Sequence, residues 1–408
     1  MTMKVFYNLP KEVVFCKKCV NSNQYPASTI EFKHTKNRKG AKYINFNSSG
    51  VCDGCVQAEV KNKKINWKNR EKELLKLLDK FRKNDGSYDC LVPGSGGKDS
   101  VYAAHLLKYK YKMNPLTVTW PPILYTEYGK KNFDNWLTVG GFDNITLRPN
   151  PKVQKILTKL SIEKLLHPFQ TFILGQKNLA PKLARQHNID LVFFGENEAE
   201  YGNPVSDNLN SLRDKSYYTY ENIKDVYLAG TKVSELIQKY KIKLSELSSY
   251  LPLKLDDFKK KDLQIHYLGY YLKWIPQEAY YYAVENTGFK ARPHRTEGTY
   301  SKYNSIDDKI DDLHYYTRFI KFGIGRATDD ASQEIRNNHI NRVEAKRLVK
   351  RFDGEFPHRY FDEIMDYLEI KPKTFFKLCD KFRSPHLWKK VNNKWRLRHT
   401  VNKDGVDD

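Results

Sequence analysis

The chain has 408 residues, and its 71 Lys and Arg outweigh its 48 Asp and Glu to give a formal charge of +23. At about 150 residues per domain, this length predicts two or three domains with a buried core. With 40% hydrophobic and 13% aromatic residues, the composition excludes a disordered protein. It has no run of about 18 apolar residues and no signal-peptide pattern at its start, so we expect a cytoplasmic protein without a membrane span.

The positive charge is spread along the chain. Basic residues form short groups, such as those within 61–64 and 259–261, and are not gathered in one block. This distribution favours a solvated basic surface over a dedicated RNA groove. Such a surface would suit a negatively charged small substrate equally well. We do not expect nucleic acid as a partner.

Cysteine spacing predicts a metal site near the N-terminus. Four of the six cysteines form two C-x-x-C pairs: Cys16, Cys19, Cys52 and Cys55. In a reducing compartment such pairs indicate metal binding, because two intervening residues let both thiolates face one tetrahedral ion. Four thiolates leave no open position, so we expect structural Zn²⁺, with an iron–sulfur cluster as the less favoured alternative. A small hairpin around residues 43–46 is expected between the pairs.

Apolar runs alternate with helical patterns through the middle of the chain. The expected strands are 88–92, 116–120, 145–147, 189–194 and 263–268. The expected helices between them are 67–81, 101–107, 133–139, 152–166 and 175–187. Strands without a polar face, alternating with helices, predict an α/β fold with a doubly wound parallel sheet. Residues 205–260 are expected to form a mostly helical, polar insertion.

After about residue 305 the periodicity is helical, with expected helices at 313–322, 331–337, 343–352 and 361–368. The sequence therefore predicts three parts: a zinc-binding module at 1–60, a sheet domain at 61–330 and a helical C-terminal region at 331–408. No internal repeat is apparent.

The most informative segment is Pro-Gly-Ser-Gly-Gly-Lys-Asp-Ser at residues 93–100. A glycine-rich turn between a strand and a helix presents unpaired N–H groups at the positive end of the helix dipole, which predicts an anion site. The spacing fits neither a Walker A loop nor G-x-G-x-x-G. It resembles S-G-G-x-D-S, the pyrophosphate loop (PP-loop) of the adenine nucleotide alpha-hydrolase superfamily.

This resemblance implies that the enzyme cleaves ATP between the α and β phosphates. It implies that the hydroxyls of Ser95 and Ser100 and the amides of Gly96 and Gly97 hold pyrophosphate. Lys98 would neutralise its charge, and Asp99 is a candidate Mg²⁺ ligand. The implied ATP-binding residues are Pro93, Gly94, Ser95, Gly96, Gly97, Ser100, Val118, Thr119 and Gly195.

Three later segments are rich in polar, aromatic and glycine residues: 195–202, 297–308 and 321–332. The first leaves the carboxyl end of an apolar strand, where its carboxylates could bind Mg²⁺ or form an ordinary acidic loop. Together with the C-x-x-C pairs and the PP-loop, these segments resemble the N-acetyl sugar amidotransferase family of bacterial O-antigen and surface-glycan synthesis. The longer segment between the cysteine pairs departs from that family's pattern and leaves the substrate in doubt.

The family resemblance assigns catalytic and substrate-binding roles to residues within the loop and outside it. Implied catalytic residues are Lys98, Asp99, Glu196, Lys302, Asp307 and Asp308. Implied substrate-binding residues are Asn197, Glu200, Arg295, Tyr300 and Arg326. The basic residues among them could equally be exposed surface cations.

The implied reaction converts the acetamido group of a nucleotide-linked N-acetyl sugar into an acetamidino group. ATP adenylates the amide oxygen, and ammonia then attacks the carbon. Cys90 and Cys379 lack a recognisable nucleophile context, so the resemblance implies a separate glutaminase and a cyclase-like, ammonia-conducting subunit. The alternative is a tRNA thiolase, which combines similar C-x-x-C pairs and PP-loop with catalytic cysteines or an iron–sulfur cluster.

Overall fold

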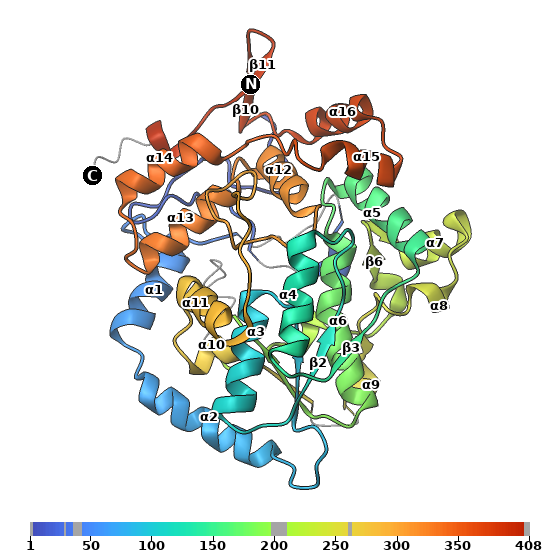
Figure 1. Cartoon of the computed structure of the whole chain (residues 1–408). Coiled ribbons are helices and arrows are strands. Elements are labelled where there is room, and N and C mark those ends of the chain that lie inside the picture. Colours follow the sequence, from blue (N-terminus) through green and yellow to red (C-terminus); the bar gives the residue numbers. More distant parts are fainter. Residues whose placement is uncertain (1–2, 28–29, 36–42, 197–209, 260–262, 404–408) are drawn as a thin grey trace.

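A parallel sheet of five strands forms the centre of the computed structural model, which describes residues 3–27, 30–35, 43–196, 210–259 and 263–403 (Figure 1). The strand order is β3-β2-β1-β4-β9, and all four neighbouring pairs are parallel. The strands are β1 (Cys90–Pro93), β2 (Pro115–Thr119), β3 (Asn144–Thr146), β4 (Leu191–Phe194) and β9 (Gln264–Tyr267). Each was expected from an apolar run, with bounds shifted by one or two residues.

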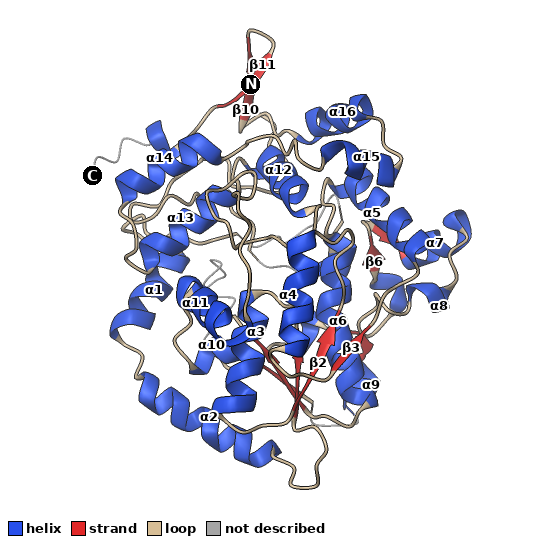
Figure 2. Cartoon of the chain, in the orientation of Figure 1, coloured by secondary structure: helices blue, strands red, loops and turns tan. Residues whose placement is uncertain are grey.

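Helices cover both faces of the sheet (Figure 2). Alternate residues of β1 enter different cores: Cys90 and Val92 pack with one helical layer, and Leu91 packs with the other. One layer contains α2 (Trp67–Phe81), α3 (Lys98–His105), α4 (Glu127–Thr138) and α11 (Pro276–Thr287). The other contains α5 (Pro151–Leu165) and α6 (Gln170–Gln186). This arrangement confirms the predicted α/β fold.

The segment after β4 differs from the polar, mostly helical insertion that we expected. It mixes short strands with short helices: β5 (Thr219–Tyr220), β6 (Tyr227–Leu228), β7 (Thr231–Lys232), α7 (Val233–Tyr240), α8 (Leu244–Leu247), β8 (Leu253–Lys254) and α9 (Leu255–Lys259). Its tyrosines are not simply polar surface, because Tyr218 and Tyr250 are buried in the core beside α6. A tyrosine ring contributes apolar area as well as a hydroxyl, so its abundance does not predict exposure.

The C-terminal region is helical, as predicted. After α10 (Leu268–Tyr271), its helices are α12 (Asp311–Phe322), α13 (Arg326–Arg336), α14 (Arg342–Phe352), α15 (Phe361–Leu368) and α16 (Pro372–Phe382). A hairpin of β10 (Trp388–Val391) and β11 (Lys394–Leu397) was not predicted. Its turn residues Asn392 and Asn393 both have positive φ, which asparagine tolerates well.

The N-terminal part contains little regular structure before α1 (Asp53–Lys63). A 3-10 helix, η1 (Glu31–Lys33), lies against α6. In the described residues of this part, isolated antiparallel bridges join Pro26 with Tyr43 and Phe46 with Cys52, and residues 36–42, next to the expected hairpin, lie outside the described residues. Among the described helices, none is both long and apolar enough to cross a membrane.

Candidate active site

The loop of residues 94–97 connects β1 to α3 and places its backbone against open space. Gly96 has a φ of +83°, and a side chain there would lie 2.7 Å from the backbone of α4, so only glycine fits. Gly97 instead has an ordinary φ of −68°, and a Cβ atom there would have no neighbour within 4 Å. The empty space beside Gly97 lies at the N-terminus of α3, where an anion would be stabilised by the helix dipole.

Side chains of the loop are held by specific contacts. Ser95 Oγ donates to Asp307 Oδ2 at 2.9 Å, and Ser100 Oγ donates to the carbonyl of Gly97 at 2.9 Å. Lys98 Nζ lies 2.6 Å from Asp99 Oδ2. Trp274 Nε1 donates to the other oxygen of Asp99 at 3.0 Å, which fixes the carboxylate beside the lysine.

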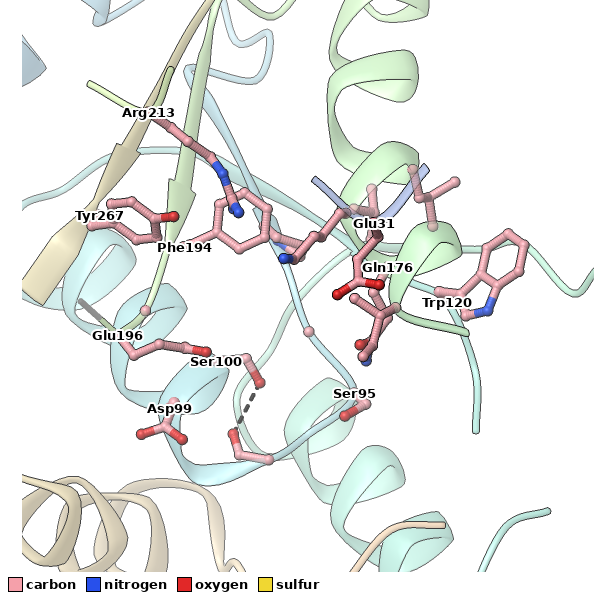
Figure 3. A pocket seen from close by; sticks show the side chains of 18 residues that line it. Glu31, Ser95, Asp99, Ser100, Trp120, Gln176, Phe194, Glu196, Arg213 and Tyr267 are labelled. Atoms are coloured by element: carbon pink, nitrogen blue, oxygen red, sulfur yellow. Dashed lines mark hydrogen bonds between the residues drawn. The ribbon is translucent and has the colours of Figure 1, made fainter. Parts of the chain in front are cut away.

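A cavity of about 480 Å³ lies at the carboxyl ends of β1, β2, β4 and β9 (Figure 3). We call it the sheet-edge cavity. It is lined by Glu31, Pro93, Gly94, Ser95, Gly97, Asp99, Ser100, Val118, Trp120, Ile173, Gln176, Lys177, Leu179, Phe194, Gly195, Glu196, Arg213 and Tyr267. Open α/β sheets bind ligands at this edge. Glu31, Asp99 and Glu196 all line the cavity, and carboxylate oxygens are the ligands that Mg²⁺ prefers.

A second cavity of about 220 Å³, which we call the acidic cavity, also adjoins the loop. Ser95, Gly97 and Asp99 line both cavities. The other residues of the acidic cavity are Gly96, Lys98, Gly129, Asn132, Phe289, Tyr303, Asn304, Ser305, Ile306, Asp307, Asp311 and Arg326. The loop therefore borders both cavities, which lie next to each other at these three residues.

Charge in the acidic cavity is partly neutralised by the protein. Burial and the neighbouring carboxylates of Asp307 and Asp308 raise the pKa of Asp311 well above its usual range, which favours the neutral acid. Arg326 is positioned by Asp330, whose Oδ1 accepts from its Nε at 2.9 Å, and by the hydroxyl of Tyr315. The cavity thus offers hydrogen-bond donors as well as acceptors.

Most of the predicted site residues line these cavities. In the sheet-edge cavity are Pro93, Gly94, Ser95, Gly97, Asp99, Ser100, Val118, Gly195 and Glu196. In the acidic cavity are Gly96, Lys98, Asp307 and Arg326. Thr119 is buried in β2 between these lining residues, with its Oγ accepting from Asn144. Asn197 and Glu200 lie outside the described residues.

Four other predicted residues line neither cavity. Arg295 is held in a two-point ion pair with Glu355, with N–O distances of 2.5 and 2.6 Å. Lys302 is exposed, and Tyr300 packs near Phe352. The buried carboxylate of Asp308 accepts from backbone amides of the segment after β2, including Leu124 at 3.3 Å. The contacts of Arg295, Tyr300 and Asp308 favour structural roles, and the predicted catalytic or binding roles of all four residues remain predictions.

Some lining residues were not predicted from the sequence. Glu31, Gln176 and Arg213 reach the sheet-edge cavity from segments far apart in the chain, and Asp311 reaches the acidic cavity from the start of α12. No local motif surrounds these residues. Only the tertiary fold brings them to the loop.

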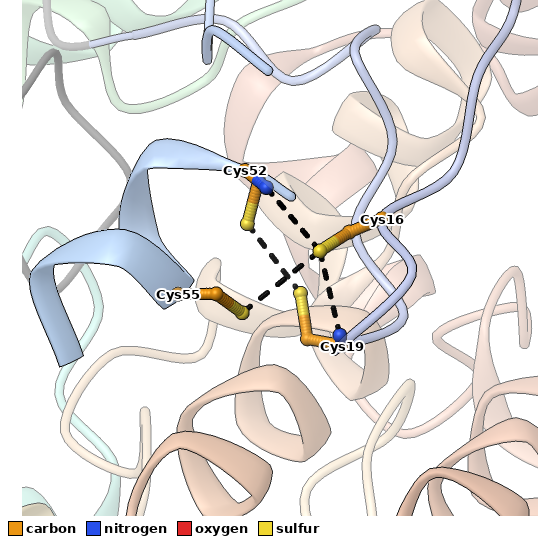
Figure 4. Close-up of side chains that lie close together, drawn as sticks. All are labelled: Cys16, Cys19, Cys52 and Cys55. Carbon is orange, nitrogen blue, oxygen red and sulfur yellow. Dashed lines mark hydrogen bonds between the residues drawn. The ribbon is translucent and has the colours of Figure 1, made fainter. Parts of the chain in front are cut away.

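The four cysteines of the two C-x-x-C pairs converge on one buried point (Figure 4). The Sγ atoms of Cys19 and Cys52 are 3.6 Å apart, and those of Cys16 and Cys55 are 3.9 Å apart. A tetrahedral Zn²⁺ with Zn–S bonds of about 2.3 Å requires sulfurs about 3.8 Å apart. The site therefore fits a single ion. An iron–sulfur cluster would distribute the sulfurs over several irons and separate them further.

Helix α13 completes the surroundings of the cysteine site. Arg336 places Nη2 3.6 Å from Cys52 Sγ and 3.7 Å from Cys19 Sγ. Gly54 permits this approach, because a Cβ atom there would lie 2.5 Å from the guanidinium carbon. A buried cation beside four thiolates offsets their charge. The cysteine site thus depends on a residue from the C-terminal region.

Comparison with known families concerns the same C-terminal region. Residues 297–402 match a family model described as "LPS biosynthesis protein WbpG-like, C-terminal domain". Because of this similarity, we call residues 297–402 the WbpG-like domain. The match confirms the resemblance predicted from segments 297–308 and 321–332. Asp307, Asp311, Arg326 and Arg336 all belong to the WbpG-like domain, which therefore contributes both to the acidic cavity and to the cysteine site.

Individual relatives either match a smaller part of this chain or have low sequence identity to it. Over 85 residues the chain is 39% identical to the uncharacterized protein MJ1599 of Methanocaldococcus jannaschii, covering 21% of this chain and 29% of that protein. The match thus spans less than a third of that relative's length.

Similar solved structures include an NH3-dependent NAD synthetase from Campylobacter jejuni, with 18% identity, a TM-score of 0.27 and coverage of 34% of this chain and 59% of that one. Another is the U34-tRNA thiolase NcsA from Methanococcus maripaludis with its [4Fe-4S] cluster. It has 15% identity and a TM-score of 0.29, and the match covers 78% of this chain and 88% of that one.

Proposed function

We propose that this chain is an ATP-dependent amidotransferase that converts the acetamido group of an N-acetyl sugar into an acetamidino group during surface-glycan synthesis. The observation that carries the proposal is the hydrogen bond between Ser95 of the PP-loop and Asp307 of the WbpG-like domain. It joins a loop suited to pyrophosphate to a domain whose family is named for lipopolysaccharide biosynthesis.

In this proposal ATP occupies the sheet-edge cavity. The apolar side chains of Val118, Trp120 and Leu179 would contact the adenosine, while the free space beside Gly97 would receive the pyrophosphate. Lys98 would offset its negative charge. Asp99 and Glu196 would hold Mg²⁺, which supplies further charge neutralisation when bound.

The acceptor sugar would approach through the acidic cavity, where Arg326 and Asn304 can hydrogen-bond a polar ligand. Its amide oxygen would attack the α-phosphorus, forming a P–O bond as the bond to pyrophosphate breaks. Ammonia would then form a C–N bond at the activated carbon, and the C–O bond would break as AMP leaves with the oxygen. Loss of a proton from nitrogen completes the amidine.

Ammonia must reach the adenylated carbon before water does, so a supply that bypasses bulk solvent is expected. We therefore propose two partners, a separate glutaminase and a cyclase-like subunit that conducts ammonia. No cysteine lines either cavity in the described part of the chain, and Cys90 and Cys379 are buried in separate cores. This placement supports amidotransfer over the thiolase alternative.

We further propose that the cysteine site holds structural Zn²⁺. The close spacing of its sulfurs and the absence of an open position support this assignment.

The test is ATP turnover with Mg²⁺, an ammonium salt and a panel of nucleotide-linked N-acetyl sugars, measured as AMP and pyrophosphate. Sugar-dependent AMP formation, with a product about one mass unit lighter through replacement of oxygen by NH, is the expected result. Sugar labelled with ¹⁸O in the amide should transfer the label to AMP. Lys98→Ala should abolish turnover, whereas Lys389→Ala on the exposed hairpin should not. Turnover with tRNA alone would contradict the proposal.

A further inference from the structure

Three side chains outside the PP-loop and the cysteine site form a separate cluster: Glu31, His34 and His167. Each offers one potential ligand atom, and these atoms all lie within 4.8 Å of one another. His34 Nδ1 is 3.4 Å from Glu31 Oε2, and the rings of His34 and His167 have centroids 5.6 Å apart. Two imidazoles and one carboxylate are a donor set used for zinc and other transition ions.

The fold holds these side chains in place without a ligand. Gln170 of α6 donates to the backbone carbonyl of Glu31 at 2.9 Å, and Phe32 anchors η1 in the core. His314 of α12 stacks on His167 with ring centroids 4.9 Å apart. The cluster therefore joins η1 to the turn between α5 and α6, and contacts from α6 and α12 position Glu31 and His167.

One nitrogen of the cluster is buried without a partner. His167 Nδ1 has less than 1 Å² of exposed surface and accepts or donates no hydrogen bond within the described residues. A buried polar atom of this kind destabilises the fold unless something binds it. A metal ion bound to Nδ1 would give this atom the partner that it lacks.

Of the three residues, Glu31 joins the cluster to the sheet-edge cavity. Glu31 lines the cavity, and Figure 3 shows its carboxylate directed into the space above Ser95 and Ser100. An ion held by three protein ligands would keep one coordination position free, and the cavity beside Glu31 would give a ligand access to it. Lys177 lines the same cavity, so an anionic oxygen is the favoured occupant of that position.

We propose that Glu31, His34 and His167 form a second metal site, distinct from the cysteine site, which binds a divalent transition ion of the Zn²⁺ type with one position open to the sheet-edge cavity. The inference does not depend on the amidotransferase proposal, because it concerns metal binding and not turnover.

The test is the metal content of the full-length protein after equilibration with Zn²⁺ and gel filtration. We expect about two equivalents in the wild type and about one in His34→Ala and in Glu31→Gln. The exposed variant His294→Ala is the matched control and should retain both. Circular dichroism identifies a variant that fails to fold. If one of the two variants does not fold, the metal content of the other tests the proposal.

Cobalt substitution distinguishes the two sites without a mutation. Co²⁺ at four thiolates gives intense sulfur-to-metal charge-transfer bands, whereas Co²⁺ bound by nitrogen and oxygen gives only weak visible bands. Titration of the metal-free protein should show both types, and His34→Ala should lose only the weak bands. A single equivalent with thiolate character alone in the wild type would overturn the proposal.

Discussion

Ser95 and Asp307 are 212 residues apart in the chain, yet the hydroxyl of one donates to the carboxylate of the other at 2.9 Å. The contact links the PP-loop to the WbpG-like domain, and both residues line the acidic cavity. Asp307 is itself held close to α4, because a Cβ atom at Gly129 would lie 2.5 Å from its backbone.

We expect Ser95 and Asp307 to contribute to catalysis together, through the hydrogen bond between them. Ser95→Ala and Asp307→Asn should each lower ATP turnover about tenfold, and the double variant should lose little more than either single variant. Steady-state AMP formation measures the effect, and thermal melting checks the fold. Asp362→Asn, on the exposed face of α15, is the control. Additive losses in the double variant would show that the two residues act independently.

The two adjacent glycines of the loop should respond differently to alanine. At Gly97 the new methyl group meets no protein atom, so the melting temperature should stay unchanged while the Kd for ATP rises at least about tenfold, because the methyl group blocks the phosphate. At Gly96 the positive φ and the backbone of α4 should make the same change destabilising.

Calorimetric melting and nucleotide titration together separate these two effects. If Gly97→Ala bound ATP as tightly as the wild type, the phosphate would have to lie elsewhere.

Arg336 should control how firmly the cysteine site holds its metal. Arg336→Met removes the buried cation next to Cys19 and Cys52, so zinc should be lost to a chromogenic chelator about tenfold faster or more. The exposed Arg347→Met on α14 is the matched control. Equal release rates in the two variants would mean that the guanidinium contributes nothing to metal retention.

The buried carboxyl group of Asp312 predicts a pH-dependent stability. Burial raises its pKa from 3.8 to about 7, although Arg292 and Arg359 oppose the shift. Between these values the folded state binds more protons than the unfolded state, so this group makes the free energy of unfolding fall as the pH rises from about 4 to about 7.

Asp312→Asn should remove that dependence, and its melting temperature relative to the wild type should rise by about 5 °C across the same range. Asp366→Asn, which is exposed, should follow the wild type. A parallel pH profile for Asp312→Asn and the wild type would contradict this assignment.

The predictions from sequence succeeded where the chemistry is local. The PP-loop and the two C-x-x-C pairs are encoded within a few consecutive residues, and apolar runs sufficed to locate β1 and β4. Contacts between distant residues gave no such local pattern. Arg295, for example, is bound in the fold by Glu355, 60 residues later, which the sequence around it does not indicate.

Contacts between distant segments explain the remaining differences. The residues next to Glu31 in the sequence form no pattern that predicts a binding site, because its position beside the sheet-edge cavity depends on Gln170. The β10–β11 hairpin could have been found, since two asparagines between apolar and aromatic residues favour a tight turn.

The contact between Arg336 and Cys52 spans 284 residues, which has a consequence for how the protein is made. At synthesis rates of about 5–20 residues per second, the second cysteine pair leaves the ribosome roughly 15–60 s before α13 can follow. During this interval the four thiols must either take up their ion without the neighbouring guanidinium or remain open to oxidation and mispairing. The supply of metal to the nascent chain should therefore influence the yield of correctly folded protein more than its supply after synthesis ends.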